Sequence, residues 1–103
     1  MVRLPKDRRP THPGEILLTE FLEPLGITQK ALAHAVGMSY VRVNEIVNGK
    51  RRVTTDTALR LGRLFDIEPE FWLNLQRAYD LWKAQKDRQV KKALNKIRPI
   101  ATA

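Results

Sequence analysis

The chain has 103 residues and a mass of 11.9 kDa, the size of one small domain. This length argues against two independent cores, a barrel enzyme or a doubly wound nucleotide-binding enzyme. With 43% hydrophobic and 29% charged residues, the composition is that of a soluble globular protein. The formal net charge of +8 and the pI of about 10.3 favour a polyanionic partner, either nucleic acid or an anionic surface.

The positive charge is concentrated at the two ends of the chain. Residues 1–9 carry a net charge of +3 and residues 83–103 carry +6, whereas residues 10–82 sum to −1. Basic ends are often solvated tails, but beside a DNA-binding domain they can reach phosphates or the minor groove. We expect such contact with DNA, and the alternative for residues 83–98 is a docking helix for another protein.

The residue types needed for most metal and redox sites are missing. There is no cysteine, and the two histidines, His12 and His34, are far apart and have no metal-spaced carboxylate partner. No metal or cofactor is therefore expected. No stretch approaches the roughly 20 apolar residues of a membrane span, and residues 1–6 do not resemble a signal peptide. These features predict a cytoplasmic protein with no membrane partner.

Helical spacing of apolar residues, punctuated by Gly and Pro and without β-branched alternation, predicts an all-α fold of five helices. The first helix begins at Pro13 and ends at Pro24 and Gly26. Its predicted buried stripe consists of Leu18, Phe21, Leu22 and Leu25. The second helix starts behind Thr28 and runs to about Ala35.

The third helix starts behind Ser39 and stops at Asn48–Gly49, where glycine accepts a left-handed conformation. The fourth opens near Thr55 or Asp56 and breaks at residues 66–69. Its inward face consists of Ala58, Leu61, Gly62 and Phe65. The fifth starts at Pro69, and residues 83–97 could prolong it as an extended C-terminal helix. Its weaker distal stripe consists of Val90, Leu94 and Ile97.

The second and third helices have the pattern of a helix-turn-helix. Such a motif needs a small residue where the two backbones approach and a glycine at the left-handed turn, and Ala33 and Gly37 stand in those places. The apolar residues at the inward positions are Leu32, Val36, Met38, Val43 and Ile46. An ordinary helical core would supply the same pattern. However, the outward face of the third helix is mostly polar and three cations follow it, which favours DNA binding.

This segment resembles the signature of phage-repressor-type (XRE, Cro-like) helix-turn-helix regulators. The matching residues are Thr28-Gln29-x-x-Leu32-Ala33, Gly37-Met38-Ser39 and Ile46-x-Asn48-Gly49-Lys50-Arg51. Further motifs are similar to the HigA-type antidotes of plasmid-maintenance and toxin–antitoxin modules. They are His12-Pro13-Gly14-Glu15-Ile16-Leu17, Thr55-x-Thr57-Ala58-Leu59-Arg60-Leu61 and Phe71-Trp72-Leu73-Asn74-Leu75-Gln76-x-x-Tyr79-Asp80-Leu81. The similarity covers about residues 10–82.

The resemblance implies a homodimer that represses its own operon by binding a double-stranded DNA operator. In many members it also implies binding to, and neutralisation of, a ribonuclease toxin of the HigB type. The chain departs from the family because antidotes are commonly acidic overall, whereas this chain carries +8. The alternatives are a free-standing regulator without a toxin, or an antidote that acts mainly by binding its toxin.

Two other classes of function are disfavoured by the sequence. An enzyme is not expected, because Ser39 has no adjacent histidine and there is no acid–base carboxylate pair, phosphate-binding glycine loop or metal cluster. RNA binding is disfavoured because the tryptophans lie on an apolar helical stripe, so no stacking platform is apparent.

The physical chemistry of base recognition and the resemblance together assign the site. The base-facing candidates are Ser39, Tyr40, Val41, Arg42, Asn44 and Glu45. We expect Arg42 to pair with guanine, Asn44 with adenine and Val41 with a thymine methyl. Glu45 could accept from cytosine or be a solvated surface residue. The phosphate-binding candidates are Gln29, Lys50, Arg51 and Arg52.

The fifth helix carries a stripe that is large for a small domain, formed by Trp72, Leu75, Tyr79 and Trp82. Part of this stripe should face a second copy of the chain, although Phe71 and Leu75 are also expected in the intrachain core. The predicted organisation is a basic arm (residues 1–11), a helix-turn-helix domain (residues 12–82) and a basic helical extension (residues 83–103).

Overall fold

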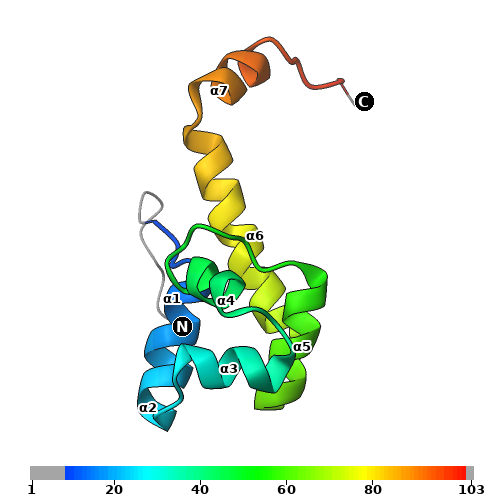
Figure 1. Ribbon diagram of the computed structural model, residues 1–103. Coiled ribbons are helices and arrows are strands. Elements are labelled where there is room, and N and C mark those ends of the chain that lie inside the picture. Colours follow the sequence, from blue (N-terminus) through cyan, green and yellow to red (C-terminus); the bar gives the residue numbers. More distant parts are fainter. Residues whose placement is uncertain (1–8, 102–103) are drawn as a thin grey trace.

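The computed structural model describes residues 9–101, and within this range all regular elements are helices (Figure 1). The elements are α1 (Pro13–Ile16), η1 (Leu17–Leu22), α2 (Glu23–Leu25), α3 (Gln29–Val36), α4 (Tyr40–Val47), α5 (Thr55–Phe65), α6 (Pro69–Lys86) and α7 (Arg88–Asn95). The all-α prediction is confirmed. None of the described helices combines the length and apolar character needed to cross a membrane. Most of the predicted basic arm, residues 1–8, lies outside the described residues.

The first helical segment differs from the prediction in its register. α1, η1 and α2 follow one another without a break, and η1 is π-helical, so its turns are wider than those of an α-helix. Leu17 and Leu22, five residues apart, are both buried, whereas Leu25 is exposed. The predicted α-helical stripe was therefore wrong at Leu25 and omitted Leu17, because the π-turns shift which side chains face the core.

The two helices of the motif begin and end where the sequence predicted. The hydroxyl groups of Thr28 and Ser39 cap α3 and α4 by accepting hydrogen bonds from backbone N–H groups at 3.0 Å and 3.2 Å. Gly37 ends α3 with a φ of 68°, a left-handed conformation that suits glycine. The predicted inward residues lie in the core or pack against it: Leu32, Ala33, Val36, Met38, Val43 and Ile46.

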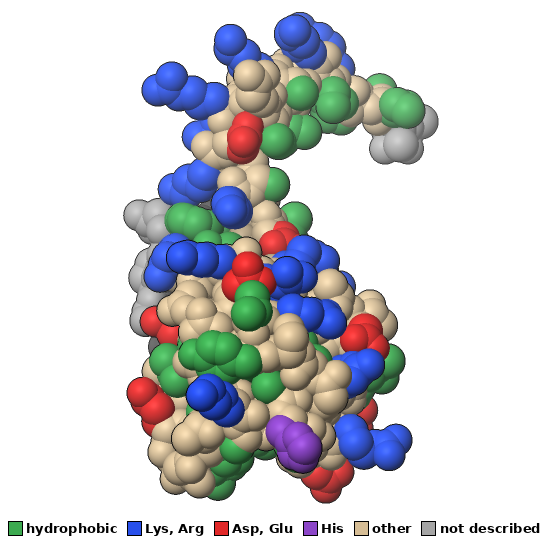
Figure 2. Space-filling view, viewed as in Figure 1, with side chains coloured by type: hydrophobic (Ala, Val, Ile, Leu, Met, Phe, Trp, Pro, Cys, Tyr) green, Lys and Arg blue, Asp and Glu red, His purple; other side chains and the backbone are tan. Residues whose placement is uncertain are grey.

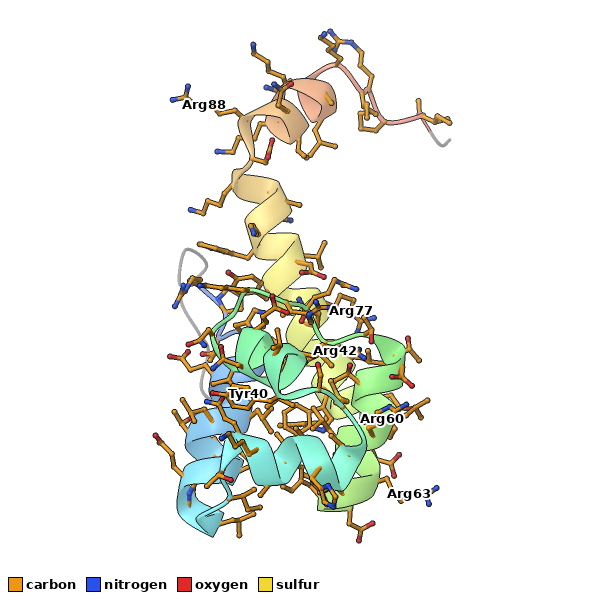
Figure 3. The ribbon with its side chains drawn as sticks, viewed as in Figure 1. Tyr40, Arg42, Arg60, Arg63, Arg77 and Arg88 are labelled. Atoms are coloured by element: carbon orange, nitrogen blue, oxygen red, sulfur yellow. The ribbon has the colours of Figure 1, made fainter. Side chains whose placement is uncertain are left out.

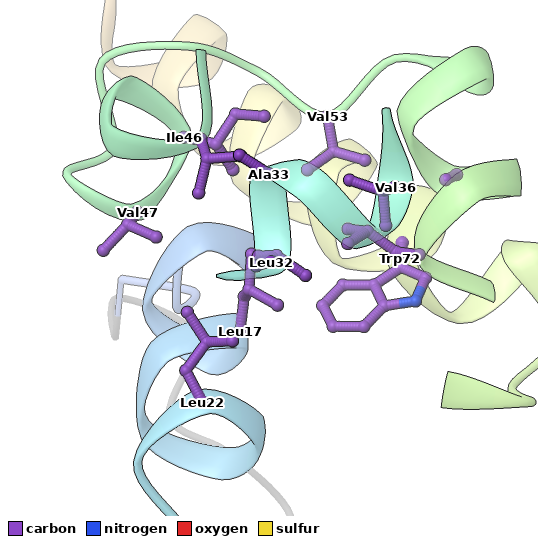
Figure 4. Packing of buried hydrophobic residues seen from close by; sticks show 12 residues of the cluster. Leu17, Leu22, Leu32, Ala33, Val36, Ile46, Val47, Val53 and Trp72 are labelled. Carbon is purple, nitrogen blue, oxygen red and sulfur yellow. The ribbon is translucent and has the colours of Figure 1, made fainter. Parts of the chain in front are cut away.

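The core lies between η1, the helix-turn-helix and the pair formed by α5 and α6 (Figure 4). Trp72 of α6 is its largest buried side chain and has an exposed fraction of 0%. Phe21 of η1 covers this indole, with 5.1 Å between the ring centroids, and also contacts Phe65 of α5 at 4.8 Å. An aromatic cluster thus joins η1, α5 and α6, three elements that are distant in the sequence.

The C-terminal segment is not one extended helix. α6 ends at Lys86, and Asp87 adopts an extended conformation, with ψ of 129°. Its carboxylate accepts hydrogen bonds from the N–H groups of Gln89 and Val90, at 2.8 Å and 3.2 Å, and so begins α7 as a separate helix. The prediction of a continuous extension was wrong because Asp is a stronger N-cap than a mid-helix residue.

Gly14 allows the first helix to pack closely against α4. An ideal Cβ at Gly14 would lie 1.7 Å from the carbonyl oxygen of Ile46, which is far inside van der Waals contact. No flexible side chain can move aside, because the obstructing atoms belong to the α4 backbone. The separation between the first helix and α4 therefore depends on the missing side chain.

We predict that Gly14→Ala destabilises the fold by about 1–3 kcal/mol, the usual cost of overpacking a rigid contact. Urea unfolding followed by circular dichroism measures the change. Glu20→Ala, at an exposed position of η1, is the control and should change the free energy of unfolding little. If G14A were as stable as the wild-type protein, the contact with α4 would not be rigid.

His12 is buried at the start of α1 and acts as its cap. Its Nδ1 accepts a hydrogen bond from the Gly14 N–H at 2.9 Å, and its ring packs edge-on against Tyr79, with centroids 4.9 Å apart. Burial lowers the pKa of His12 below 6.5, and the nearby Asp80 carboxylate only partly opposes this effect. The folded protein therefore favours the neutral imidazole.

This lowered pKa predicts that stability falls as the solution is acidified. Above pH 6.5 His12 is mostly neutral in both states; at lower pH the unfolded chain binds the proton first, so stability decreases as pH falls through the folded-state pKa. Urea unfolding between pH 7.5 and pH 5 should show this loss. His12→Asn, which keeps a capping oxygen, should reduce the slope, and His34→Asn at the exposed histidine should retain it. Equal slopes in all three proteins would contradict the assignment.

Candidate nucleic-acid interface

α4 presents one face to the core and the opposite face to solvent. Val43, Ile46 and Val47 hold the inner face, whereas Tyr40 is exposed and Val41 has an exposed fraction of 62%. Figure 3 labels Tyr40 and Arg42, which both come from α4. The outward face is thus available to a partner, and the hydrophobic contacts behind it fix its orientation.

Gln29 and Asn44 connect the two helices of the motif at this surface. The Asn44 side-chain amide donates a hydrogen bond to Oε1 of Gln29 at 3.0 Å. This contact uses only one polar group of each side-chain amide. The NH₂ group of Gln29 and the side-chain Oδ1 of Asn44 can therefore still bind a ligand. The sequence predicted that Gln29 binds a phosphate and that Asn44 binds a base. In the structure the two side chains are in direct contact.

Ser39 and Arg42 have more restricted environments than the other residues of this face. The Ser39 oxygen already accepts the capping hydrogen bond, so its hydroxyl proton and its second lone pair are left to offer a ligand. Arg42 is half-buried, and its Nε is a buried donor without a partner among the described residues. An unsatisfied buried donor is costly, so movement of the Arg42 guanidinium toward an external acceptor would relieve that cost.

The cations of the loop after α4 are not all free. Arg51 forms a 2.9 Å ion pair with Glu45, and Arg52 is paired with Asp80 of α6. These pairs are largely exposed, and exposed pairs contribute only about 0–1 kcal/mol, so a phosphate could displace either carboxylate at little cost. The sequence predicted the cations but gave no sign of these pairings, which join residues from different elements.

A buried amide anchors the same loop to α6. Gln76 is almost fully buried; its Oε1 accepts a hydrogen bond from the Val53 N–H at 2.7 Å, and its Nε2 donates to Asp80 at 2.9 Å. Burial of Asp80 disfavours its charge, but the hydrogen bonds from Arg52 and Gln76 outweigh this and hold its pKa below its usual value. Sequence reasoning missed this network, although Gln76 stands four residues after Trp72 on the buried face of α6.

Arg60 is a second structural residue that the sequence did not identify. Its guanidinium donates hydrogen bonds to the carbonyl groups of Val36 and Gly37, at 2.7 Å and 3.3 Å, and pairs with Asp56 at 3.0 Å. The cation therefore satisfies carbonyl groups at the C-terminal end of α3 and holds the turn of the motif against α5 (Figure 3).

The stripe predicted as a dimer surface is largely used within the chain. Trp72 has no exposed surface, so the prediction that it contacts a partner is wrong; η1 supplies the aromatic residue that covers it. Tyr79 packs on His12, and Leu75 and Trp82 are half-buried. Phe71, which was expected in the core, is exposed instead.

Comparison with known proteins identifies the family. The helix-turn-helix family model matches residues 18–72. The chain is 50% identical over 91 residues to virulence-associated protein I of Dichelobacter nodosus, covering 88% of this chain and 82% of that protein. It is 49% identical over 75 residues to antitoxin HigA-1 of Vibrio cholerae, covering 73% and 70% of the two chains.

A solved structure gives the same assignment. The structure of Pseudomonas aeruginosa antitoxin HigA with the higBA promoter is 44% identical in sequence and aligns with a TM-score of 0.84, covering 90% of this chain and 100% of that one. The family model spans more than half of the chain, and the relatives align over most of its length. The chain therefore belongs to the helix-turn-helix family of DNA-binding regulators and, within it, to the HigA-type antitoxins.

Proposed function

We propose that this chain is a sequence-specific DNA-binding repressor that binds the operator of its own toxin–antitoxin operon as a homodimer. The observation that carries this proposal is the outward face of α4, where Tyr40 and Val41 are exposed, the polar Arg42, Asn44 and Glu45 are half-buried, and the buried inner face fixes the orientation of the helix. The similarity to an antitoxin solved with its promoter supports the proposal. No catalytic role is included in it.

In the proposed complex, α4 enters the major groove and reads the base edges. The bidentate guanidinium of Arg42 suits the two acceptors of guanine, and the Asn44 amide suits adenine. Val41, whose side chain is exposed on this face, can contact a thymine methyl group. Ser39 and Tyr40 offer hydroxyl groups at the N-terminal end of α4, and Glu45 can accept from cytosine once Arg51 has turned away from it.

The phosphate contacts come from the residues beside α4. Gln29 lies in the first turn of α3, where N–H groups and the helix dipole favour an anion. Lys50, Arg51 and Arg52 lie in the loop after α4, and the last two would exchange Glu45 and Asp80 for phosphate oxygens. These contacts supply affinity and salt dependence, whereas the α4 face supplies specificity.

The geometry of helix-turn-helix recognition supports the proposed homodimer. One α4 reads only one half-site, and two copies related by a two-fold axis place their recognition helices about 34–36 Å apart, in successive major grooves. The predicted operator is therefore an inverted repeat with half-sites one helical turn apart.

We predict that Arg42→Ala and Asn44→Ala each weaken binding to the DNA upstream of the gene by about 5- to 150-fold, corresponding to 1–3 kcal/mol for one base contact. An electrophoretic shift with wild-type and scrambled operator measures the loss. Arg63→Ala, which removes the same charge from an exposed position of α5, is the control and should retain affinity. Wild-type affinity of both α4 variants would contradict the assignment of the recognition helix.

The second part of the proposal is neutralisation of a HigB-type ribonuclease toxin, supported by the 49% identity to antitoxin HigA-1. Co-expression of this chain with the protein encoded by the adjacent gene should relieve growth inhibition caused by that protein, and the two should co-purify. The Arg42→Ala variant is the control, because losing DNA contacts should leave neutralisation intact. Failure of both rescue and co-purification would favour a free-standing regulator.

A further inference from the structure

Carboxylates gather in two stretches of the chain that contain no Lys or Arg. Residues 16–29 carry Glu20 and Glu23, and residues 64–76 carry Asp66, Glu68 and Glu70. All of these acidic residues are exposed. Figure 2 shows Lys and Arg side chains along the C-terminal segment, whereas Asp and Glu side chains lie at the sides and the lower end of the domain. The nearly balanced charge of residues 10–82 is therefore unevenly distributed over the surface.

Aromatic packing brings the two acidic stretches together. The ring of Phe21 in η1 lies 4.8 Å from that of Phe65 in α5 and 6.3 Å from that of Phe71 in α6, measured between centroids. Each of these aromatic residues has a carboxylate residue as its direct neighbour in the chain, and neighbouring Cα atoms are only about 3.8 Å apart. These neighbours are Glu20, Asp66 and Glu70. The carboxylates of both stretches therefore border one aromatic cluster.

An aromatic side chain lies partly open to solvent among these carboxylates. Phe71 has an exposed fraction of 38%, although its ring packs edge-on against the buried Trp72, with 5.1 Å between the centroids. The core thus fixes this ring while part of it stays accessible to a partner. We call Glu20, Glu23, Asp66, Glu68, Glu70 and Phe71 the acidic surface.

The carboxylates of the acidic surface lack the partners that other carboxylates of the chain have. Within residues 9–101, the carboxylates engaged elsewhere are Glu45, Asp56 and Asp80 in ion pairs and Asp87 as the cap of α7. In the same range no carboxylate of the acidic surface forms an ion pair, not even with Arg63, which lines a hollow of about 250 Å³ at its edge. Like charges gathered on one surface repel one another, so a partner that brings cations relieves this repulsion.

We propose that the acidic surface docks a basic protein and that this protein is the ribonuclease toxin of the proposed function. This inference rests on the second part of that function and gives it a location. It also explains how a chain with a net charge of +8 can act as an antidote. A docked partner responds mainly to the charge within about 8–10 Å, the screening length at physiological salt, and the positive charge of this chain is concentrated at its two ends.

The charge pattern selects a basic protein over other partners. Nucleic acid is repelled by carboxylates, and a second copy in a two-fold contact would place the same acidic surface against itself. A metal ion is not favoured, because the described residues contain no group of three His, Cys, Asp or Glu side chains that could hold one. A ribonuclease binds a polyanion and therefore carries exposed Lys and Arg. Phe71 supplies the aromatic contact that is typical of the centre of a protein interface.

Docking at the acidic surface leaves the proposed DNA contacts uncovered. None of its residues belongs to α4 or to the loop after it. Figure 1 shows α2 and the end of α5 at the end of the domain away from α7. Toxin binding and operator binding therefore use different side chains, so substitutions can separate the two.

The first test removes charge from the acidic surface. Glu20→Gln/Glu68→Gln/Glu70→Gln keeps the size of the side chains and removes three negative charges. The association rate with the protein encoded by the adjacent gene, measured by biolayer interferometry at about 50 mM salt, should fall at least about tenfold, because charge complementarity acts mainly on association. The salt dependence of this rate should flatten. The variant should bind the operator at least as tightly as wild type, which checks that it is folded.

A matched variant controls for net charge. Gln85→Lys/Gln89→Lys/Asn95→Lys changes the charge of the chain by the same amount, at exposed positions of α6 and α7. Its association rate should stay within about twofold of wild type. Equal slowing of both triple variants would contradict the inference, because net charge rather than the acidic surface would then control binding.

The second test removes the aromatic contact. Phe71→Ala should raise the dissociation constant for the same protein at least about tenfold, mostly through faster dissociation, as truncation of a central aromatic residue does. Leu64→Ala truncates an apolar side chain with a nearly equal exposed fraction of 39%, in the hollow between α5 and α3, and should leave the constant unchanged. Circular dichroism at the assay temperature checks that both variants stay folded.

The inference fails in two ways that differ in what they mean for the proposed function. If the acidic triple variant and Phe71→Ala both bind like wild type, the toxin docks elsewhere and its neutralisation stands. If the wild-type chain does not bind the protein of the adjacent gene, both the inference and the second part of the proposed function are lost. Operator binding by the same preparation would then preserve the repressor.

Discussion

The contact of Gly14 with the Ile46 carbonyl is the constraint on which the orientation of α4 depends. Because no side chain intervenes, the start of α1 lies directly against the backbone of α4. The same contact places His12 beside the end of α4, where it caps α1 and packs on Tyr79 of α6. One close backbone approach therefore fixes α4 relative to both the first helix and the last helix of the domain, so its outward face is presented in one orientation.

Electrostatics complete the positioning of the loop after α4. The charge of residues 10–82 is nearly balanced, and the structure uses this balance locally by pairing Arg51 with Glu45 and Arg52 with Asp80. The carboxylates hold the two cations in defined positions without binding them strongly, since the pairs are exposed. Buried Gln76 then ties the loop backbone to α6. A substitution at Gln76 of α6 would therefore also disturb the loop that carries Lys50, Arg51 and Arg52.

Local signals allowed much of the fold to be predicted. Thr28 and Ser39 are capping residues and Gly37 is a left-handed terminator, so α3 and α4 begin and end as their own residues dictate. The prediction failed where register or burial depended on distant parts of the chain. The π-turns of η1 changed which leucines face inward, and Phe21 from that segment covered Trp72, which the sequence had assigned in part to a partner.

The candidate site likewise has some features that local sequence predicts and others that depend on packing. Which side chains lie on the outer face of α4 follows from helical periodicity, and Tyr40 and Val41 are exposed as that periodicity requires. The pairing of Gln29 with Asn44, the ion pairs of the loop and the Arg60 contacts with the turn join residues 6 to 28 positions apart. No local pattern specifies such contacts, because they depend on how the helices pack.

The sequence by itself determined the helix-turn-helix, its caps, the side chains on the outer face of its second helix and the basic character of the C-terminal segment, because each depends on residues within one or two helical turns. Only the tertiary structure decided which aromatic residues are core, which cations are already paired and which apolar surface is left without cover. Those properties depend on the distances between elements, which close packing of the whole chain sets.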